Sequence, residues 1–125
     1  DFKRLMDING ADLWQPDLTL CGGLSVGREI FSLAKLAHVR MSPHVWGGAV
    51  GLAAALHFAA SLYPWPHSDN VPFPVLLEYD RGENALRDKL LRCPIKYIDG
   101  HLQVPDGPGL GIELNWDIIE KYRIN

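Results

Sequence analysis

A twice-repeated order of short apolar segment, glycine pair and helix constrains the fold of this chain more than any other feature. The segments are, in chain order, a strand within 11–20, Gly22-Gly23, a helix over 24–37, a strand over 39–44, Gly47-Gly48, a helix over 49–62 and a third strand over 75–79. The strands do not alternate polar and apolar residues, which is typical of strands that are covered on both faces. Strands and helices in this order predict parallel βαβ units with right-handed crossovers, and therefore an α/β fold.

Stop, cap and turn signals predict the remaining elements. Helical spacing opens the chain and ends at Asn9-Gly10, where a glycine tolerates the left-handed turn of a helix end. Ser25 is the predicted cap of the amphipathic helix over 24–37. Beyond the third strand we expect a hairpin around Asp99-Gly100, a turn-rich stretch over 105–111 and a short helix that begins at 115 or 116 and ends at 123.

Charge and cysteine usage exclude several classes of protein. The 125 residues suffice for one buried core, while a net charge of −3 with dispersed Lys and Arg offers no basic surface to nucleic acid or to an anionic membrane. Cys21 and Cys93 have no CxxC spacing, which favours two reduced, buried thiols over a disulfide framework or a zinc site. The longest apolar run, 49–63, is too short to cross a bilayer. We therefore expect a cytoplasmic protein.

Three ionisable residues stand where the three predicted strands end. They are Asp17, His44 and Glu78. The carboxyl ends of parallel strands form the catalytic edge of α/β folds, so we expect all three at that edge, with Asp17 and His44 within hydrogen-bonding distance. A histidine beside a carboxylate delivers or accepts a proton near neutral pH. If Leu76 and Leu77 shield Glu78, it can stay protonated and donate a hydrogen bond to developing oxyanion charge.

Simpler interpretations compete with each of these candidates. A single charged residue at a strand end is most often solvated, and only the shared edge favours chemistry. The Gly22-Gly23 helix start resembles a phosphate cradle but lacks the Lys of a Walker loop, so a tight turn is favoured. His57 lies in an apolar helix and is interpreted as a core or interface histidine. Trp46, close to His44, is a candidate wall of the site, although tryptophan is more often a core residue. Three further tryptophans are assigned to packing: Trp14, Trp65 and Trp116.

Four stretches together resemble the end of members of the mandelate racemase/muconate lactonizing enzyme family of the enolase superfamily. They are Gln15-Pro16-Asp17-Leu18-Thr19-Leu20-Cys21-Gly22-Gly23, Ser42-Pro43-His44-Val45-Trp46-Gly47, Leu77-Glu78-Tyr79-Asp80 and Val104-Pro105-Asp106-Gly107-Pro108-Gly109-Leu110-Gly111. They occur in the family's order across essentially the whole chain. The resemblance implies that His44 is an acid or base, that Asp17 orients it, and that Glu78 stabilises the oxygen of an enolate. The His–Asp pair marks the mandelate racemase-like subgroup.

The resemblance also implies an architecture larger than this chain. A closed (β/α) barrel needs roughly 200 residues, so the chain is expected to be a C-terminal fragment with about the last three barrel strands and their helices. Residues 1–93 are assigned to the barrel, and 94–125 are assigned to a hairpin and terminal helix of the capping domain. The family's magnesium ion is expected in the intact parent. No metal ligand and no cofactor are expected in this fragment, because the acidic ligands would precede Asp1.

The predicted function follows from this assignment. The parent is expected to be a Mg-dependent acid-sugar dehydratase or 2-hydroxy-acid racemase that abstracts the proton alpha to a carboxylate. Its partners are then a small carboxylate substrate and, in a homo-oligomer, further copies of itself. The isolated 125-residue chain is expected to be inactive. The alternative is a noncatalytic structural or interaction module, whose exposed sheet edges and apolar faces are covered by self-association.

Overall fold

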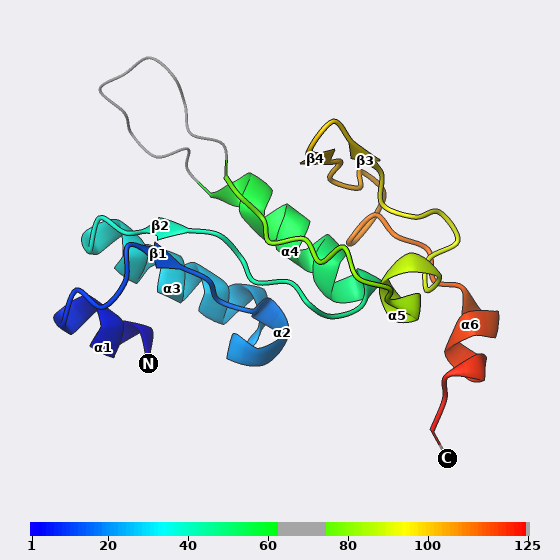
Figure 1. Ribbon diagram of the computed structural model, residues 1–125, viewed down its shortest axis with the longest axis horizontal. Coiled ribbons are helices and arrows are strands. Elements are labelled where there is room, and N and C mark those ends of the chain that lie inside the picture. The colour runs from blue at the N-terminus through cyan, green and yellow to red at the C-terminus, as the bar shows by residue number, and fades with distance from the viewer. Residues whose placement is uncertain (63–74, 125) are drawn as a thin grey trace.

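A computed structural model describes residues 1–62 and 75–124 of the chain. The N-terminal elements are α1 (Phe2–Asp7), β1 (Leu13–Trp14), α2 (Leu18–Cys21), α3 (Gly23–Leu36), β2 (Arg40–Met41) and α4 (Ala49–Ser61). They are followed by α5 (Ala85–Asp88), β3 (Tyr97–Ile98), β4 (His101–Leu102) and α6 (Trp116–Lys121). Figure 1 shows β1, β2 and α3 at one end of the molecule, α4 across the middle, and α5, the β3–β4 hairpin and α6 at the other end.

The predicted parallel βαβ unit is present. Strands β1 and β2 pair in parallel, with Leu13 opposite Arg40 and Trp14 opposite Met41, and α3 forms the connection between them. The pairing continues past the strands, since the Ser42 amide donates to the Trp14 carbonyl at 3.0 Å and the His44 amide donates to the Pro16 carbonyl at 3.2 Å. Both strands are shorter than predicted. Prolines follow each of them, and a proline cannot donate to the ladder.

The core lies between this parallel pair and the two long helices. Buried residues recur on α3 at Gly27, Ile30 and Ala34, the spacing of one helix face. Helix α4 is buried on nearly all sides, as its uniformly apolar sequence predicts. Trp14 is 1% exposed and its ring lies 5.4 Å from that of Phe2. The core cluster is formed by Trp14, Leu18, Ile30, Ala34, Met41, Val45, Leu52, Ala55, Leu56, Phe58 and Leu62.

The start of α3 corrects one expectation. Ser25 was the predicted cap, but the helix begins at Gly23, and Gly22 is the residue at the cap position. Gly22 has φ +113°, a left-handed backbone conformation that glycine adopts at little cost. The same glycine ends α2. Gly23, the first residue of α3, also has positive φ, at +80°, so the chain passes from one helix to the next through two left-handed glycines.

The prediction of a third strand over 75–79 is wrong. The segment belongs to no strand, and its backbone contact with the β2 side is the Glu78 amide donating to the Pro43 carbonyl at 3.3 Å. Pro43 has no N–H to return, so no ladder forms there. Val75, Leu77 and Tyr79 pack against the core, whereas Leu76 is 55% exposed. The two faces of this segment therefore have different surroundings.

The C-terminal elements agree with the sequence. Strands β3 and β4 are antiparallel, and Asp99 and Gly100 between them both have positive φ, 47° and 81°, as a two-residue hairpin turn of the primed kind requires. Helix α6 begins after Asn115. The turn-rich stretch over 105–111 is tied to α4, because the His57 Nε2 lies 3.1 Å from the Leu110 carbonyl oxygen. The interpretation of His57 as a satisfied histidine agrees with this contact.

The structure confirms some of the predictions for single residues and contradicts others. Trp14 packs in the core as predicted, but Trp116 is 62% exposed, so its assignment to packing is wrong in this chain. Trp65 lies outside the described residues. Cys21 is half-buried and Cys93 is exposed, so the expectation of two buried thiols is wrong for Cys93. Across 1–62 and 75–124, no helix is long and apolar enough to span a membrane.

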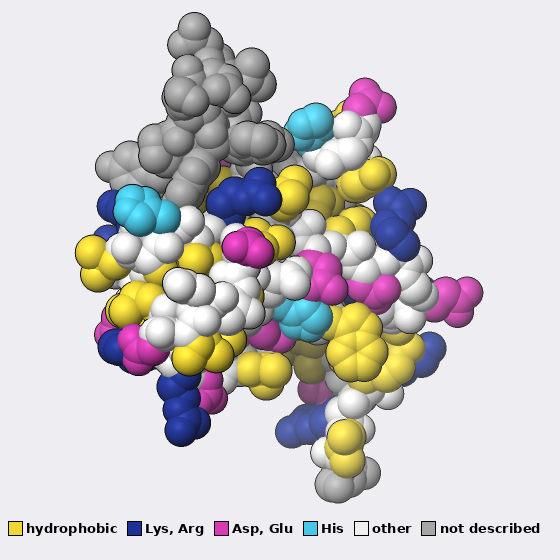
Figure 2. Space-filling view, turned by 60° about the vertical axis from the view of Figure 1, so that its left-hand side comes forward, with side chains coloured by type: hydrophobic (Ala, Val, Ile, Leu, Met, Phe, Trp, Pro, Cys, Tyr) yellow, Lys and Arg dark blue, Asp and Glu magenta, His cyan; other side chains and the backbone are white. Residues whose placement is uncertain are grey.

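Charged side chains do not gather on the face shown in Figure 2. Lys and Arg are dispersed there among acidic and hydrophobic side chains. The division of the chain at residues 93 and 94 into a barrel part and a capping part stays a prediction.

Candidate active site

Asp17 occupies the turn between β1 and α2. Its backbone is extended and its carboxylate caps α2, because Oδ1 accepts hydrogen bonds from the Thr19 amide at 2.8 Å and the Thr19 hydroxyl at 2.6 Å. An aspartate that precedes a helix commonly takes this position, since it satisfies an orphan amide of the first turn. The predicted hydrogen bond between the Asp17 and His44 side chains is not found among the contacts of the described residues.

His44 pairs with Glu78 instead. Its Nδ1 contacts the Glu78 Oε2 at hydrogen-bonding distance, and the Gln15 side-chain amide donates to the same oxygen at 3.4 Å. The Glu78 backbone amide also bonds to Pro43, the residue before His44. Asp17 lies beside this group, because His44 donates its backbone amide to the residue that precedes Asp17. The three predicted residues thus share one edge of the molecule, and the direct side-chain contact is between His44 and Glu78.

The pair is open to solvent. The side chains of His44 and Glu78 are 38% and 45% exposed. The expectation that Leu76 and Leu77 shield Glu78 is wrong in this chain, because the segment alternates. Leu77 turns toward the core, while Leu76 and Glu78 are both exposed.

The contacts decide which ring nitrogen is available for chemistry. A carboxylate that binds Nδ1 fixes the orientation and tautomer of the imidazole. Among the contacts of the described residues none involves the Nε2 of His44, so this nitrogen is the one left to exchange a proton with another molecule. The donor from Gln15 makes Glu78 Oε2 an acceptor, which fits a carboxylate that orients His44 better than an acid that donates to an oxyanion. Gln15 was not singled out as a site residue from the sequence.

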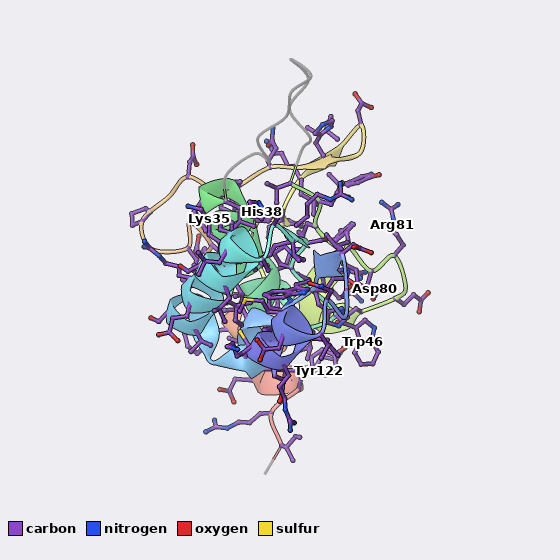
Figure 3. The ribbon with its side chains drawn as sticks, turned by 90° about the vertical axis from the view of Figure 1, so that its left-hand side faces the viewer. Lys35, His38, Trp46, Asp80, Arg81 and Tyr122 are labelled. Atoms are coloured by element: carbon purple, nitrogen blue, oxygen red, sulfur yellow. The ribbon has the colours of Figure 1, made fainter. Side chains whose placement is uncertain are left out.

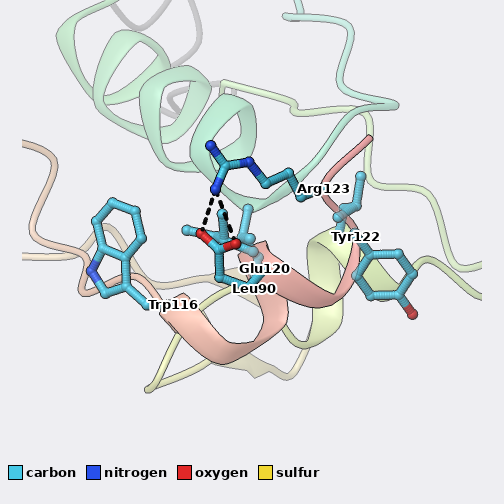
Figure 4. A pocket seen from close by; sticks show the side chains of 7 residues that line it. Leu90, Trp116, Glu120, Tyr122 and Arg123 are labelled. Atoms are coloured by element: carbon cyan, nitrogen blue, oxygen red, sulfur yellow. Dashed lines mark hydrogen bonds and ion pairs between the residues drawn. The ribbon is translucent and has the colours of Figure 1, made fainter. Parts of the chain in front are cut away.

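Trp46 and the surface hollows lie around this group without enclosing it. Trp46 is 73% exposed and is seen on the same side of the molecule as Asp80 and Arg81 in Figure 3. A hollow of about 460 Å³ lies between α5 and α6, lined by apolar side chains and by Glu120 and Arg123, which form an ion pair at 3.1 Å (Figure 4). A second, of about 310 Å³, lies beside β2 near Asn9 and Val39. Neither of these hollows is lined by His44 or Glu78, and the role of Trp46 as a wall stays a prediction.

The described residues do not form a magnesium site by themselves. Within 1–62 and 75–124 no group of three or more His, Cys, Asp or Glu side chains is close enough together to hold a metal ion. Magnesium takes near-octahedral oxygen coordination, usually with one or two protein carboxylates completed by water or substrate. Asp17 and Glu78 are each engaged in other contacts.

A parallel βαβ unit with a histidine–carboxylate pair beyond its strands is consistent with part of a (β/α)-barrel domain. Residues 1–118 match the family described as Enolase C-terminal domain-like. The chain belongs to this family. The family membership and the partial-barrel fold class predicted from the sequence are confirmed, whereas the assignment to the His–Asp subgroup stays a prediction.

Individual relatives are similar along nearly the whole chain. The chain is 44% identical over 121 residues to a D-galactarolactone cycloisomerase of Agrobacterium fabrum, covering 97% of this chain and 32% of that protein. The structure of the 3,6-anhydro-D-galactonate cycloisomerase from Zobellia galactanivorans is similar with a TM-score of 0.81 and 40% identity, covering 97% and 32%. An enolase from Pantoea ananatis with bound D-gluconate and magnesium is similar with a TM-score of 0.76 and 25% identity, covering 98% and 28%.

These comparisons also set the scale of the chain. It spans about a third of the length of the relatives it matches. Arabinonate and galactonate dehydratases also match, at 33% identity or less. The relatives are thus enolase-superfamily enzymes that include both cycloisomerases and acid-sugar dehydratases.

Proposed function

We propose that this chain supplies the proton-transfer residues of an enolase-superfamily enzyme that removes the proton alpha to the carboxylate of an acid-sugar derivative. The observation that carries the proposal is the contact between His44 Nδ1 and Glu78 Oε2 beyond the parallel strands. This contact orients the ring and leaves Nε2 to take the proton. General base catalysis by a positioned side chain contributes roughly 10²- to 10⁴-fold to a rate.

The three predicted residues receive distinct roles in this proposal. His44 is the base that takes the alpha proton and the acid that then delivers a proton to the leaving oxygen. Glu78 orients His44 through the contact between its Oε2 and the ring Nδ1. Asp17 is the second carboxylate at this edge. Among the contacts of the described residues, only its Oδ1 is engaged, by Thr19, and Oδ2 is proposed to bind the substrate. Trp46, close to His44 along the chain, is proposed to contact the substrate.

The type of reaction depends on which carbon–oxygen bond of the substrate breaks after the alpha proton is removed. Proton removal gives an enediolate, whose electron pair forms a double bond to the beta carbon while the bond from that carbon to its oxygen breaks. A ring oxygen that leaves in this way opens the ring and takes up a proton, which is a cycloisomerisation. A hydroxyl leaves as water, which is a dehydration. The sequence prediction named dehydratase or racemase, and the 44% identity to a cycloisomerase adds ring opening.

Magnesium belongs to the proposal for the whole protein only. When bound, this ion stabilises negative charge on the carboxylate oxygens of a substrate. The described residues do not make such a site, so the acidic ligands are proposed to lie elsewhere in the whole protein. The proton transfer assigned to His44 requires no metal ligand from the described residues. A homo-oligomer likewise stays a prediction.

The test is proton exchange in the whole protein that contains this stretch. The variant His44→Asn should abolish exchange of the alpha proton with D₂O, while magnesium affinity stays nearly unchanged. Asp17→Asn should reduce turnover less, because it keeps the imidazole. His101→Asn is a matched control, since His101 is exposed on the hairpin and its Nδ1 contacts the Asp99 carbonyl at 2.8 Å. Equal exchange rates in all four proteins would show that His44 is not the base.

A further inference from the structure

We propose that Asn84, the N-cap of α5, and Arg87, within α5, are positioning residues that hold His44 and Glu78 in contact. The inference rests on the proposed function, because it assigns the group that orders the same pair. Helix α5 is one turn long and lies between the loop that follows His44 and the segment that follows Glu78. Asn84 binds the first of these segments and Arg87 binds the second.

Asn84 binds the loop that carries His44. Its Oδ1 caps α5 by accepting hydrogen bonds from the Leu86 and Arg87 amides, both at 3.1 Å. Its Nδ2 donates to the carbonyl oxygen of Gly47 at 3.3 Å. The next residue, Gly48, is so close to α5 that an added Cβ would lie 3.3 Å from the Leu86 carbonyl oxygen. The loop after His44 is therefore held against the backbone of α5.

Arg87 binds the segment that carries Glu78. Its side chain is only 9% exposed, and its Nη1 donates to the Asp80 carbonyl at 2.6 Å and to the Asp80 carboxylate at 3.0 Å. Its Nη2 donates to the Gly82 carbonyl at 2.6 Å. The guanidinium carbon also lies 5.5 Å from the centre of the Tyr79 ring. The residues that follow Glu78 are thus fixed through both backbone and side chain.

The geometry explains why such a support is needed. His44 and Glu78 are each about two-fifths exposed, and an exposed ion pair competes with water and gains little from holding two side chains in one place. Their backbones must therefore bring them together. A lysine at position 87 would keep the charge but could not place several donors in a fixed plane. The planar fork of Arg87 serves Asp80 and Gly82 at once.

The experiment reads the state of the His44 ring in the 125-residue chain. Ring ¹⁵N shifts and the exchange rate of the Nδ1 proton are measured by NMR in the wild type, in Arg87→Lys and in Asn84→Asp. Asn84→Asp keeps the capping oxygen but loses the donor to Gly47. Glu78→Gln provides the reference state without the pair. Arg92→Lys is the control, since Arg92 forms an exposed ion pair with Glu113 at 2.9 Å.

The expected result is specific to positioning. In Arg87→Lys and Asn84→Asp the Nδ1 proton should exchange at least tenfold faster and the ring shifts should move toward those of Glu78→Gln, with amide dispersion unchanged. Arg92→Lys should match the wild type. Unchanged ring signals in both α5 variants, with a clear change in Glu78→Gln, would overturn the positioning role and leave the proposed function standing. No change even in Glu78→Gln would remove the support for both. If Arg87→Lys fails to fold, the Asn84→Asp result decides.

Discussion

Replacing Gly27 by alanine should destabilise the chain, although alanine favours a helix. Gly27 lies inside α3 and is buried. An alanine Cβ there would lie 2.6 Å from Leu18 Cδ2 and 3.2 Å from the Phe58 ring. Leu18 and Phe58 are 5% and 2% exposed, so neither side chain has free space to move into.

The magnitude is set by two opposing effects. Removing a glycine from a helix interior gains about 1 kcal/mol, while forcing an extra methyl group into a packed core costs typically about 1–3 kcal/mol. The contact of 2.6 Å is shorter than real Cβ contacts, so the cost should lie in the upper half of that range. We therefore expect a net loss of about 1–2 kcal/mol in the free energy of unfolding. Leu18 directly follows Asp17, so the movement also disturbs the cap of α2.

Gly51→Ala is the matched control. Its Cβ would meet only the Thr19 methyl group, at 2.9 Å, and because Thr19 is exposed, this methyl group can shift by a small amount without leaving its hydrogen bond to Asp17. Gly51→Ala should therefore leave stability unchanged or raise it by less than about 1 kcal/mol. Urea unfolding followed by tryptophan fluorescence, which changes as the buried Trp14 becomes exposed, measures both changes. A Gly27→Ala chain as stable as the wild type, or a Gly51→Ala chain that loses more than Gly27→Ala, would refute the packing argument.

Three further predictions concern binding, reactivity and pH. The isolated chain should show no tight, stoichiometric magnesium site by calorimetry and no turnover of acid sugars, because its described residues contain no group of three possible ligands; one tight site would contradict this. Burial raises the pKa of the Cys21 thiol, so iodoacetamide should modify the exposed Cys93 first, as mass spectrometry can show, and faster modification of Cys21 would contradict this. The hydrogen bond from Arg87 holds the pKa of Asp88 below its usual range, so the stability it gives is present at neutral pH and is lost as the pH falls through that lowered value. Asp88→Asn should therefore lower the urea midpoint at neutral pH and hardly change it in strong acid, and an equal effect at both would exclude this linkage.

The sequence correctly predicts those elements that are specified by residues close together in the chain. Asp99-Gly100 specifies the hairpin because both residues accept positive φ, and the apolar run over 49–62 specifies α4. The third strand was predicted wrongly because its apolar residues say nothing about the partner, and the partner backbone at Pro43 has no N–H to give. Ser25 was chosen as a cap from residue type alone, while the chain uses the left-handed Gly22 instead.

The candidate site shows the same division. The common edge of Asp17, His44 and Glu78 follows from where the strands end, and that part could be predicted. Which carboxylate contacts the imidazole could not, because Thr19 competes for Asp17 through a local capping contact. An aspartate two residues before a threonine, at the start of a helix, is the sequence signal for this capping contact. The contacts of Asn84 and Arg87 join segments far apart in the chain, and nothing in their spacing predicts them.

The alternating exposure of 75–79 has a practical consequence for protein engineering. One face of this segment packs against the core through Val75, Leu77 and Tyr79, and the other presents Leu76 and Glu78 to solvent. In this chain, position 76 can therefore be varied with little effect on folding. Positions 75, 77 and 79 cannot. Within these five residues, the exposed position 76 tolerates substitution, whereas the positions that pack against the core do not.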